Sequence, residues 1–481
     1  MVRGTDGELH EASWPEALAA AAQGLKGKRA AVLVGGRATN QDAYGYAKFA
    51  RVALNTNDID FRARTSSEEE RSFLSSIALN LNTTYKDLDK ADQVVLVGFE
   101  PEDESPIVFL RLYKQVRKRG LKIVTDAAYA SRGSKKLNAT LIKSASEISN
   151  LTEKSVVIIG ERAAEVSGAI STAVAAAKSS NAKLAWIPRR AGERGALEAG
   201  ALGTLLPGGR PVTDPQARVD MQAAWGVDSL PQTVGRDTDA ILRDLHDGKI
   251  EALLVGGVDP LDISAHHHDG LEKAFVVSLE IRRSAITEIA NVVLPVAAVA
   301  EKSGSFMSWE GRSRSFESAI ADSLQRSDVR VLSMLAEQMG TPINLPSVSA
   351  AAQELANLGT WEKRSDFTPS SAVPVKVHGD EALLSSWRLL LDHGSLQDGE
   401  PNLAGTAHPS VAVISPERAV SLRVTNGDLL RISTRDGWIM LPCVIEDIDK
   451  DTIWVPRNSS GSRVIATLGV ASGAAVSVVK A

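Results

Sequence analysis

The sequence is nearly free of cysteine, since its 481 residues contain only Cys443. A [4Fe–4S] cluster normally takes four thiolates, and a structural zinc site takes several cysteines or histidines. Neither kind of sulfur-based site can be assembled from this chain. Cys443 lies in the alternating apolar segment "IMLPCVIED", which predicts an inert thiol in a hydrophobic core.

The sequence also lacks the marks of a membrane, secreted or nucleic-acid-binding protein. No run approaches the ~18 apolar residues of a membrane span. The first residues, "MVRGTDGELHEASW", carry acidic side chains where a signal peptide has an apolar core. The formal net charge of -5 gives no basic footprint for nucleic acid. We therefore expect a cytosolic protein that reaches the cytoplasmic side of a membrane only through partners, without inserting into it.

Short apolar strands and helices alternate along most of the chain. Capping-box spacing at Ser13–Glu16 predicts a helix over Trp14–Leu25, and similar patterns predict helices at Pro106–Arg119 and Ala163–Lys178. This alternation predicts an α/β fold with doubly wound parallel sheets that helices cover on both faces.

The organisation predicted from these patterns has five parts. A segment with one helix (1–27) precedes two α/β blocks (28–150 and 151–340), and a connector (341–380) leads to the C-terminal part (381–481). Strand-like segments and turn signals such as Asn-Gly-Asp predict that the last part is a small β-barrel.

Several predicted strands end at glycine, namely at Gly35-Gly36, Gly98, Gly160 and Gly256-Gly257. A strand–glycine–helix junction presents free N–H groups beside a helix N-terminus, which suits a phosphate. The surrounding residues match neither G-x-G-x-x-G nor a P-loop. The alternative, that glycine only permits a tight turn, therefore stays open.

The stretch Asn291–Glu317, here called the signature loop, organises the rest of the chain. It contains "VVLPVAAVAEKSGSFMSWEGRSRSFE", which predicts a strand ended by Pro295 and a short alanine-rich helix. Gly304 suits a left-handed residue after that helix. We expect Phe306 or Trp309 to anchor the polar loop that follows against the core.

The signature loop resembles that of the molybdopterin oxidoreductase superfamily, and within it most resembles the G subunit of bacterial NADH-quinone oxidoreductase (complex I). Other stretches agree, including "RRAGERGALEAGALGTLLPGGRPV", "LLVGGVDPLD" and "LQDGEPNLAGTAHPSV". The resemblance covers nearly the whole chain. It implies a molybdopterin-oxidoreductase-like fold and a C-terminal barrel of the kind that binds dinucleotides in molybdopterin enzymes.

In that superfamily, the turn occupied here by Gly256-Gly257-Val258-Asp259-Pro260 lies beside a nucleotide arm of the pterin cofactor. The usual motif has Asn-Pro, whereas Asp259 would repel a pyrophosphate. We therefore expect no molybdopterin in this chain. The vestigial candidates for cofactor binding are Gly35, Gly36, Gly256, Gly257, Asp259 and Pro260.

We predict neither catalytic nor metal-binding residues. No G-x-S-x-G motif or nucleophile–base pairing is evident, and His266-His267-His268 lacks a partner motif for a metal. A basic run at Lys114–Arg119 is interpreted as a solvated helix face or as a contact with an acidic partner. Structural roles are expected for the signature residues Glu301, Gly304, Phe306, Trp309, Glu310, Gly311 and Arg312.

The favoured hypothesis is a scaffold or accessory part of the peripheral arm of complex I. In the family of G subunits the iron–sulfur clusters lie in cysteine-rich domains that this chain is expected to lack, so its partners would be other peripheral-arm subunits or a separate iron–sulfur fragment. Two alternatives remain: an active molybdopterin-dependent oxidoreductase or its subunit, and a nucleotide-binding α/β protein outside electron transport.

Overall fold

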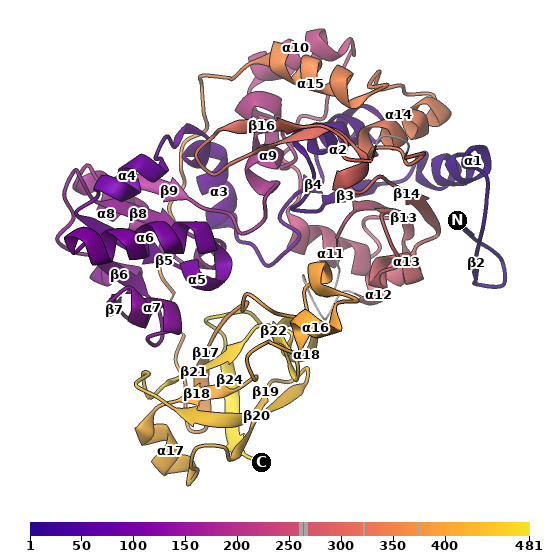
Figure 1. The fold of residues 1–481 in the computed structure, drawn as a ribbon. Helices are drawn as coiled ribbons and strands as arrows, with labels where there is room; N and C mark the ends of the chain where they lie inside the picture. The colour runs from indigo at the N-terminus through magenta and orange to yellow at the C-terminus, as the bar shows by residue number, and fades with distance from the viewer. Residues whose placement is uncertain (259–262, 264–267, 321–322, 374) are drawn as a thin grey trace. The chain divides into compact units, whose positions relative to one another are not determined.

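The computed structural model describes all residues except 259–262, 264–267, 321–322 and 374 (Figure 1). The chain forms two compact units. Unit 1 comprises Met1–Ser66, Arg71–Asn80 and Arg190–Phe367, and unit 2 comprises Ser67–Glu70, Leu81–Arg189 and Thr368–Ala481.

Unit 1 is built on a seven-stranded sheet with the order β2-β1-β14-β13-β12-β3-β4. The strands β4, β3, β12, β13 and β14 run parallel, and β1 and β2 add an antiparallel hairpin at the β14 edge. The strands are β1 (Val2–Arg3), β2 (Leu9–His10), β3 (Ala30–Val34), β4 (Ile59–Asp60), β12 (Ala252–Gly256), β13 (Phe275–Glu280) and β14 (Val292–Pro295). Two small ribbons lie outside this sheet: β10 (Leu205–Leu206) with β11 (Arg210–Pro211), and β15 (Gly304–Met307) with β16 (Ser313–Phe316).

The helices of unit 1 form where caps and apolar stripes coincide. Ser13 and Glu16 close the expected capping box of α1, and Thr39 caps α2 through the backbone N–H of Asp42. Helix α14 packs against both α1 and α2. The helices are α1 (Trp14–Leu25), α2 (Asn40–Val52), α9 (Glu193–Glu198), α10 (Pro215–Trp225), α11 (Thr238–His246), α12 (His268–Lys273), α13 (Ala285–Ile289), α14 (Asp328–Met339) and α15 (Val348–Leu358). A further helix, α3 (Glu68–Ser76), contributes residues to both units.

Unit 2 begins with a five-stranded parallel sheet of order β7-β6-β5-β8-β9. Strands β5 and β8 are buried along their whole length, as expected of central strands that helices cover on both faces. The strands are β5 (Gln93–Val97), β6 (Lys122–Asp126), β7 (Thr140–Ile142), β8 (Val156–Ile159) and β9 (Lys183–Trp186). The helices are α4 (Tyr85–Lys90), α5 (Pro101–Glu104), α6 (Pro106–Arg119), α7 (Arg132–Lys136) and α8 (Ala169–Ser179).

The C-terminal part of unit 2 is a closed six-stranded barrel with the order β17-β21-β18-β20-β19-β24. Its core is made of buried aliphatic side chains together with Cys443, which is 1% exposed. The prediction that this cysteine is a core residue is confirmed. The strands are β17 (Glu381–Trp387), β18 (Ala412–Ile414), β19 (Leu429–Ser433), β20 (Trp438–Ile445), β21 (Thr452–Pro456) and β24 (Ala475–Lys480). A hairpin, β22 (Asn458–Ser459) with β23 (Ser462–Arg463), and helices α16 (Pro401–Ala404), α17 (Pro416–Leu422) and α18 (Val464–Leu468) complete it.

The predicted parallel sheets and the small C-terminal barrel are both confirmed. However, the two sheets do not correspond to the predicted contiguous blocks 28–150 and 151–340. Strands β3 and β4 pair in one sheet with β12, β13 and β14, whereas β5 to β9 form the other. The long excursion between β4 and β12 therefore supplies a complete second sheet.

One predicted helix is wrong in its extent. The sequence pattern predicts a continuous helix over Ala163–Lys178, but a 3-10 turn at Glu161–Glu165 precedes α8. The break lies at Gly168, whose φ of +79° is left-handed and cannot continue a right-handed helix. Among the described residues, no helix is both long enough and apolar enough to cross a membrane.

Candidate functional site

Each parallel sheet has one point at which the chain reverses the direction in which it adds strands. In unit 1 this switch point lies between β3 and β12, and in unit 2 it lies between β5 and β8. In open α/β sheets, ligands bind outside the carboxyl ends of the strands at such a point. The glycines singled out in the sequence fall at these two places.

At the unit 1 switch point, glycine allows two strand ends to touch. The backbone N–H of Gly35 donates to the carbonyl of Gly256 at 2.7 Å. A side-chain carbon on Gly35 would lie 2.3 Å from the carbonyl oxygen of Gly257, and one on Gly36 would lie 2.4 Å from Cδ of Arg190. The turn is therefore closed against its neighbour, and the side chain of Arg190 covers Gly36.

The charges beside this turn are matched within unit 1. Glu193 lies 3.3 Å from the guanidinium of Arg190 and 3.7 Å from that of Arg64, and the three side chains are at most 9% exposed. Burying a charge costs free energy unless an opposite charge lies beside it. Here the carboxylate of Glu193 offsets the charges of both arginines. Two arginines thus converge at the switch point, but on a carboxylate that the chain itself supplies.

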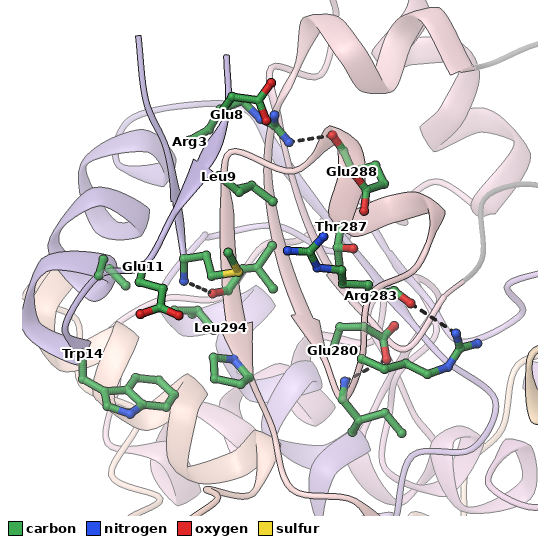
Figure 2. A pocket seen from close by; sticks show the side chains of 17 residues that line it. Arg3, Glu8, Leu9, Glu11, Trp14, Glu280, Arg283, Thr287, Glu288 and Leu294 are labelled. Atoms are coloured by element: carbon green, nitrogen blue, oxygen red, sulfur yellow. Dashed lines mark hydrogen bonds between the residues drawn. The ribbon is translucent and has the colours of Figure 1, made fainter. Parts of the chain in front are cut away.

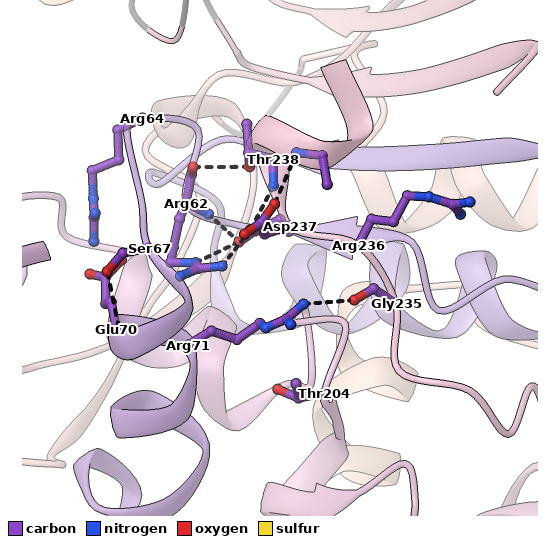
Figure 3. A network of polar contacts seen from close by, with 12 residues as sticks. Arg62, Arg64, Ser67, Glu70, Arg71, Thr204, Gly235, Arg236, Asp237 and Thr238 are labelled. Atoms are coloured by element: carbon purple, nitrogen blue, oxygen red, sulfur yellow. Dashed lines mark hydrogen bonds and ion pairs between the residues drawn. The ribbon is translucent and has the colours of Figure 1, made fainter. Parts of the chain in front are cut away.

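A second buried network follows β4. The side chains of Asp60 and Arg62 are completely buried and form an ion pair of 2.8 Å. Thr238 donates its hydroxyl to the carbonyl of Arg62, and Arg71 donates to the carbonyl of Gly235 at 3.0 Å (Figure 3). These bonds tie the segment after β4 to the start of α11. Their role is to hold the fold together.

The unit 2 switch point is closed in the same manner. Gly98 follows β5 with a φ of +57°, and a side-chain carbon there would lie 2.2 Å from the backbone nitrogen of Ala163. A side-chain carbon on Gly160, which follows β8, would lie 2.5 Å from the carbonyl oxygen of Gly98. Glycine is required at both turns because the backbones approach so closely.

Carboxylates surround the unit 2 switch point. Burial raises the pKa of Glu100 to about 7, and the charges of Asp103 and Glu104 act in the same direction. Ser131 donates its hydroxyl to Glu100 at 2.7 Å, whereas Glu104 forms an ion pair of 2.9 Å with the buried guanidinium of Arg162. Burial therefore favours the protonated form of Glu100.

A cavity of about 610 Å³ opens at this edge within unit 2. Gly98, Asp126 and Arg162 are among the residues that line it. Asp126 ends β6, and burial raises its pKa to about 6. An acidic residue at the end of the second strand is the usual partner of a ribose hydroxyl in dinucleotide-binding folds. Asp126 could accept a hydrogen bond from a sugar hydroxyl. Of the cations that line the cavity, Lys143 and Arg162 are already paired with carboxylates, whereas Lys376 also lines it.

A short sequence pattern marks this acidic edge, and it differs from the standard phosphate-binding motifs. Gly98-Phe99-Glu100-Pro101 follows β5, as Gly257-Val258-Asp259-Pro260 follows β12, so a G-x-acid-Pro pattern ends one strand in each sheet. Asp259 and Pro260 themselves lie outside the described residues. The interpretation of Asp259 as unfavourable for an anion applies equally to Glu100.

The signature loop is anchored by a buried ion triad. The ammonium of Lys302 lies 2.7 Å from Asp42 and 2.8 Å from Asp328, and its side chain is 10% exposed. Tyr46 donates its hydroxyl to Asp328, and Thr39 donates to Asp42. Burial alone would lower the pKa of Lys302, but the two carboxylates raise it above its ordinary value. The lysine therefore stays charged.

Further polar contacts fix the same segment. The backbone N–H of Ser305 donates to Gln41, and the side chains of Asn40 and Gln41 both donate to the Ser305 hydroxyl. Glu301 accepts from the backbone N–H of Ala298 at 2.9 Å and so caps a 3-10 turn. The first turns of α2 and the signature loop thus form one hydrogen-bonded unit.

Gly304 does not adopt the predicted left-handed conformation, and the expected alanine-rich helix is only the 3-10 turn Val299–Glu301. Gly304 instead begins β15 in extended conformation. A side-chain carbon there would lie 2.9 Å from the methyl group of Thr39. The small residue is needed for close approach to the start of α2, a contact that no local sequence pattern encodes.

The end of the loop is a hairpin. Phe306 stacks on Phe316 with ring centroids 5.5 Å apart, and Gly311, with a φ of +79°, completes the turn. Trp309 is half-buried rather than fully buried. Glu310 and Arg312 approach to 3.7 Å across the turn, with the arginine 51% exposed.

Unit 1 also has a pocket of about 470 Å³ beside the strand that begins the signature loop (Figure 2). Its wall is shared by the N-terminal hairpin and the ends of β13 and β14, and Arg3 donates to the backbone carbonyl of Glu288 there. Carboxylates such as Glu8 and Glu280 alternate with arginines such as Arg283. The mixed charges favour neither an anion nor a cation.

Among the described residues, no group of three or more histidine, cysteine, aspartate or glutamate side chains could hold a metal ion. His266 and His267 lie outside the described residues. The thiol of Cys443 donates to the carbonyl of Thr425 inside the barrel, so it is enclosed in that core.

Comparisons with known proteins give a consistent family. The sequence profile of the molybdopterin oxidoreductase family matches residues 1–338. The chain is 47% identical over 501 residues to the G subunit of NADH-quinone oxidoreductase from Mycobacterium tuberculosis (strain CDC 1551 / Oshkosh), a match that covers 98% of this chain and 62% of that protein. It is 44% identical over 530 residues to the protein of the same name from Streptomyces coelicolor, covering 99% of this chain and 63% of the relative.

The chain thus spans less than two thirds of these relatives. Among solved structures, acetylene hydratase from Pelobacter acetylenicus matches with a TM-score of 0.59 at 12% identity, covering 98% of this chain and 90% of that one. At this identity the likeness concerns the fold alone.

Proposed function

The chain belongs to the molybdopterin oxidoreductase family, and from that premise we propose that it is a scaffold or accessory part of the peripheral arm of NADH-quinone oxidoreductase (complex I). The observation that carries the proposal is the 47% identity to the G subunit from Mycobacterium tuberculosis along 98% of this chain. In this role the chain has no redox centre of its own.

The residues at the two switch points do not fit a pterin cofactor with nucleotide arms. At one, Arg190 lies over Gly36 and its charge is committed to Glu193. At the other, a side chain on Gly98 or Gly160 would collide with neighbouring backbone, and the acidic Asp126 lines the adjoining cavity, where its charge would repel a pyrophosphate. The one thiol is enclosed in the barrel core. Each of these features supports a cofactor-free role.

The proposed partners are other peripheral-arm subunits or a separate iron–sulfur fragment. Docking of this kind would bury on the order of 1,000 Å² or more of surface. The chain would then lie on the cytoplasmic side of the membrane, held there by its partners, and would position a cluster-bearing domain without carrying electrons.

The first test is the composition of the purified chain. We expect no stoichiometric iron, molybdenum or tungsten by elemental analysis, and no oxidation of NADH with quinone or ferricyanide. Molybdenum or tungsten near one atom per chain, together with a released pterin, would contradict the proposal and favour an active molybdopterin-dependent oxidoreductase.

The second test is assembly. The tagged chain is co-expressed with complex I subunits and recovered at moderate salt, and its partners are identified by mass spectrometry. We expect peripheral-arm subunits to co-purify. Recovery of the chain alone from a lysate rich in these subunits would refute the scaffold role.

A further inference from the structure

The outward face of α6 in unit 2 carries large aliphatic side chains where a solvated helix carries polar ones. Ile107 is 60% exposed and Leu110 is 57% exposed. The opposite face of the helix is already used, because Val108, Phe109 and Leu112 are buried within unit 2. Residues three apart are neighbours on a helix surface, so the two exposed side chains form one apolar patch.

The same face continues into a positively charged end. Lys114 and Lys118 follow the patch at helical spacing, and both are exposed. Residues 106–122 contain six lysines and arginines and no acidic residue, in a chain with a net charge of -5. Some of these cations are used locally: Arg111 pairs with Asp89 at 2.5 Å. Lys114 and Lys118 form no ion pair with any described residue.

We propose that this α6 face, defined by Ile107, Leu110, Lys114 and Lys118, is a docking surface for a partner protein segment that presents aliphatic side chains followed by carboxylates. The inference rests on the proposed scaffold function, and it names the surface and the chemistry of the partner. Aliphatic groups of the partner would cover the patch, and carboxylates would meet the two lysines.

The arrangement favours a protein over an anionic membrane. A helix lying in a membrane surface places apolar and basic side chains on opposite faces. Here they occupy successive turns of one face, and the other face is buried. A partner with an apolar and an acidic patch in succession matches this order.

The test uses the full chain co-expressed with complex I subunits, as wild type and as Lys114→Glu/Lys118→Glu. The control, Lys26→Glu/Lys154→Glu, changes the net charge equally at exposed lysines outside α6. We expect the α6 variant to reduce recovery of partner subunits roughly tenfold while the control does not, with both variants showing wild-type melting temperatures. A photo-cross-linking residue at Leu110 should then attach to an aliphatic stretch of a partner that continues into aspartate and glutamate residues.

The outcomes separate the two proposals. If wild type recovers partners and the α6 variant does so equally well, the α6 inference is wrong while the scaffold function stands. If wild type recovers no partner, both fall. A third outcome would also overturn the inference. If the wild type sediments with phosphatidylserine vesicles, the α6 variant does not, and partner recovery is unchanged, the face binds a membrane surface.

Discussion

Replacing Lys302 by methionine tests whether the buried ion triad holds the signature loop. In the wild type, one ammonium lies within 2.8 Å of both Asp42 and Asp328. Methionine preserves much of the side-chain volume but removes the charge. Two carboxylates would then face each other in a buried site with no cation between them.

Breaking a buried ion pair by removing one partner costs about 3–5 kcal/mol, because it leaves an unpaired charge. We expect Lys302→Met to lower the free energy of unfolding of unit 1 by this amount near pH 7.5. The loss should be smaller at pH 5. Burial and the charge of Asp328 already act to raise the pKa of Asp42, and the pKa will rise further without the lysine. When the folded state raises the pKa of a carboxyl group, the folded protein loses stability as the pH rises through that pKa. Lowering the pH to 5 should therefore restore part of the stability of the variant.

The assay is urea unfolding followed by intrinsic fluorescence at pH 5 and pH 7.5. Lys363→Met provides a matched control, since Lys363 also contacts one carboxylate, Asp214, but is 78% exposed and should cost less than about 1 kcal/mol. The double variant Lys302→Met/Asp42→Asn should recover part of the loss. Equal, small effects for both lysines at both pH values would refute the anchoring role.

Two further predictions concern the other features of the site. Because the pKa of Glu100 is raised to about 7 in the folded state, about 3 kcal/mol of stability present below pH 4.5 should be lost as the pH rises through 7. Glu100→Gln should flatten that dependence in denaturant titrations between pH 4.5 and 8, and an unchanged slope would contradict the burial argument. Trp309→Ala should cost about 1–2 kcal/mol, less than the roughly 3–5 kcal/mol of a fully buried tryptophan, because the ring is half-buried. A melting temperature equal to that of the wild type would show that Trp309 does not anchor the loop.

A helix is predictable from the sequence where its cap and its apolar stripe both lie within one segment. The Ser13–Glu16 capping box and an apolar stripe define α1, and the predicted bounds Trp14–Leu25 are the observed ones. Helix α6 is likewise predicted over its full extent, Pro106–Arg119. Strand β17 pairs with both β21 and β24, so its place in the barrel is defined by residues far apart in the sequence.

Strand partners were not predictable from the same information. Strands β3 and β5 are both short, buried and followed by glycine, so nothing local says which sheet each joins. The assumption that neighbours in sequence share a sheet fails because β12 pairs with β3 across a long excursion. Only the three-dimensional pairing reveals the two switch points, and hence that the glycines are needed for contact between strand ends.

Lys302 shows why the main anchor of the signature loop could not be recognised in the sequence. Aromatic side chains are the usual anchors of a polar loop, whereas an isolated lysine normally lies in solvent. The partners of Lys302 are Asp42, in the first turn of α2, and Asp328, at the start of α14, so the triad exists only once both helices are in place. A lysine buried at that junction fixes the base of the loop to two helices, while the turn around Arg312 stays exposed.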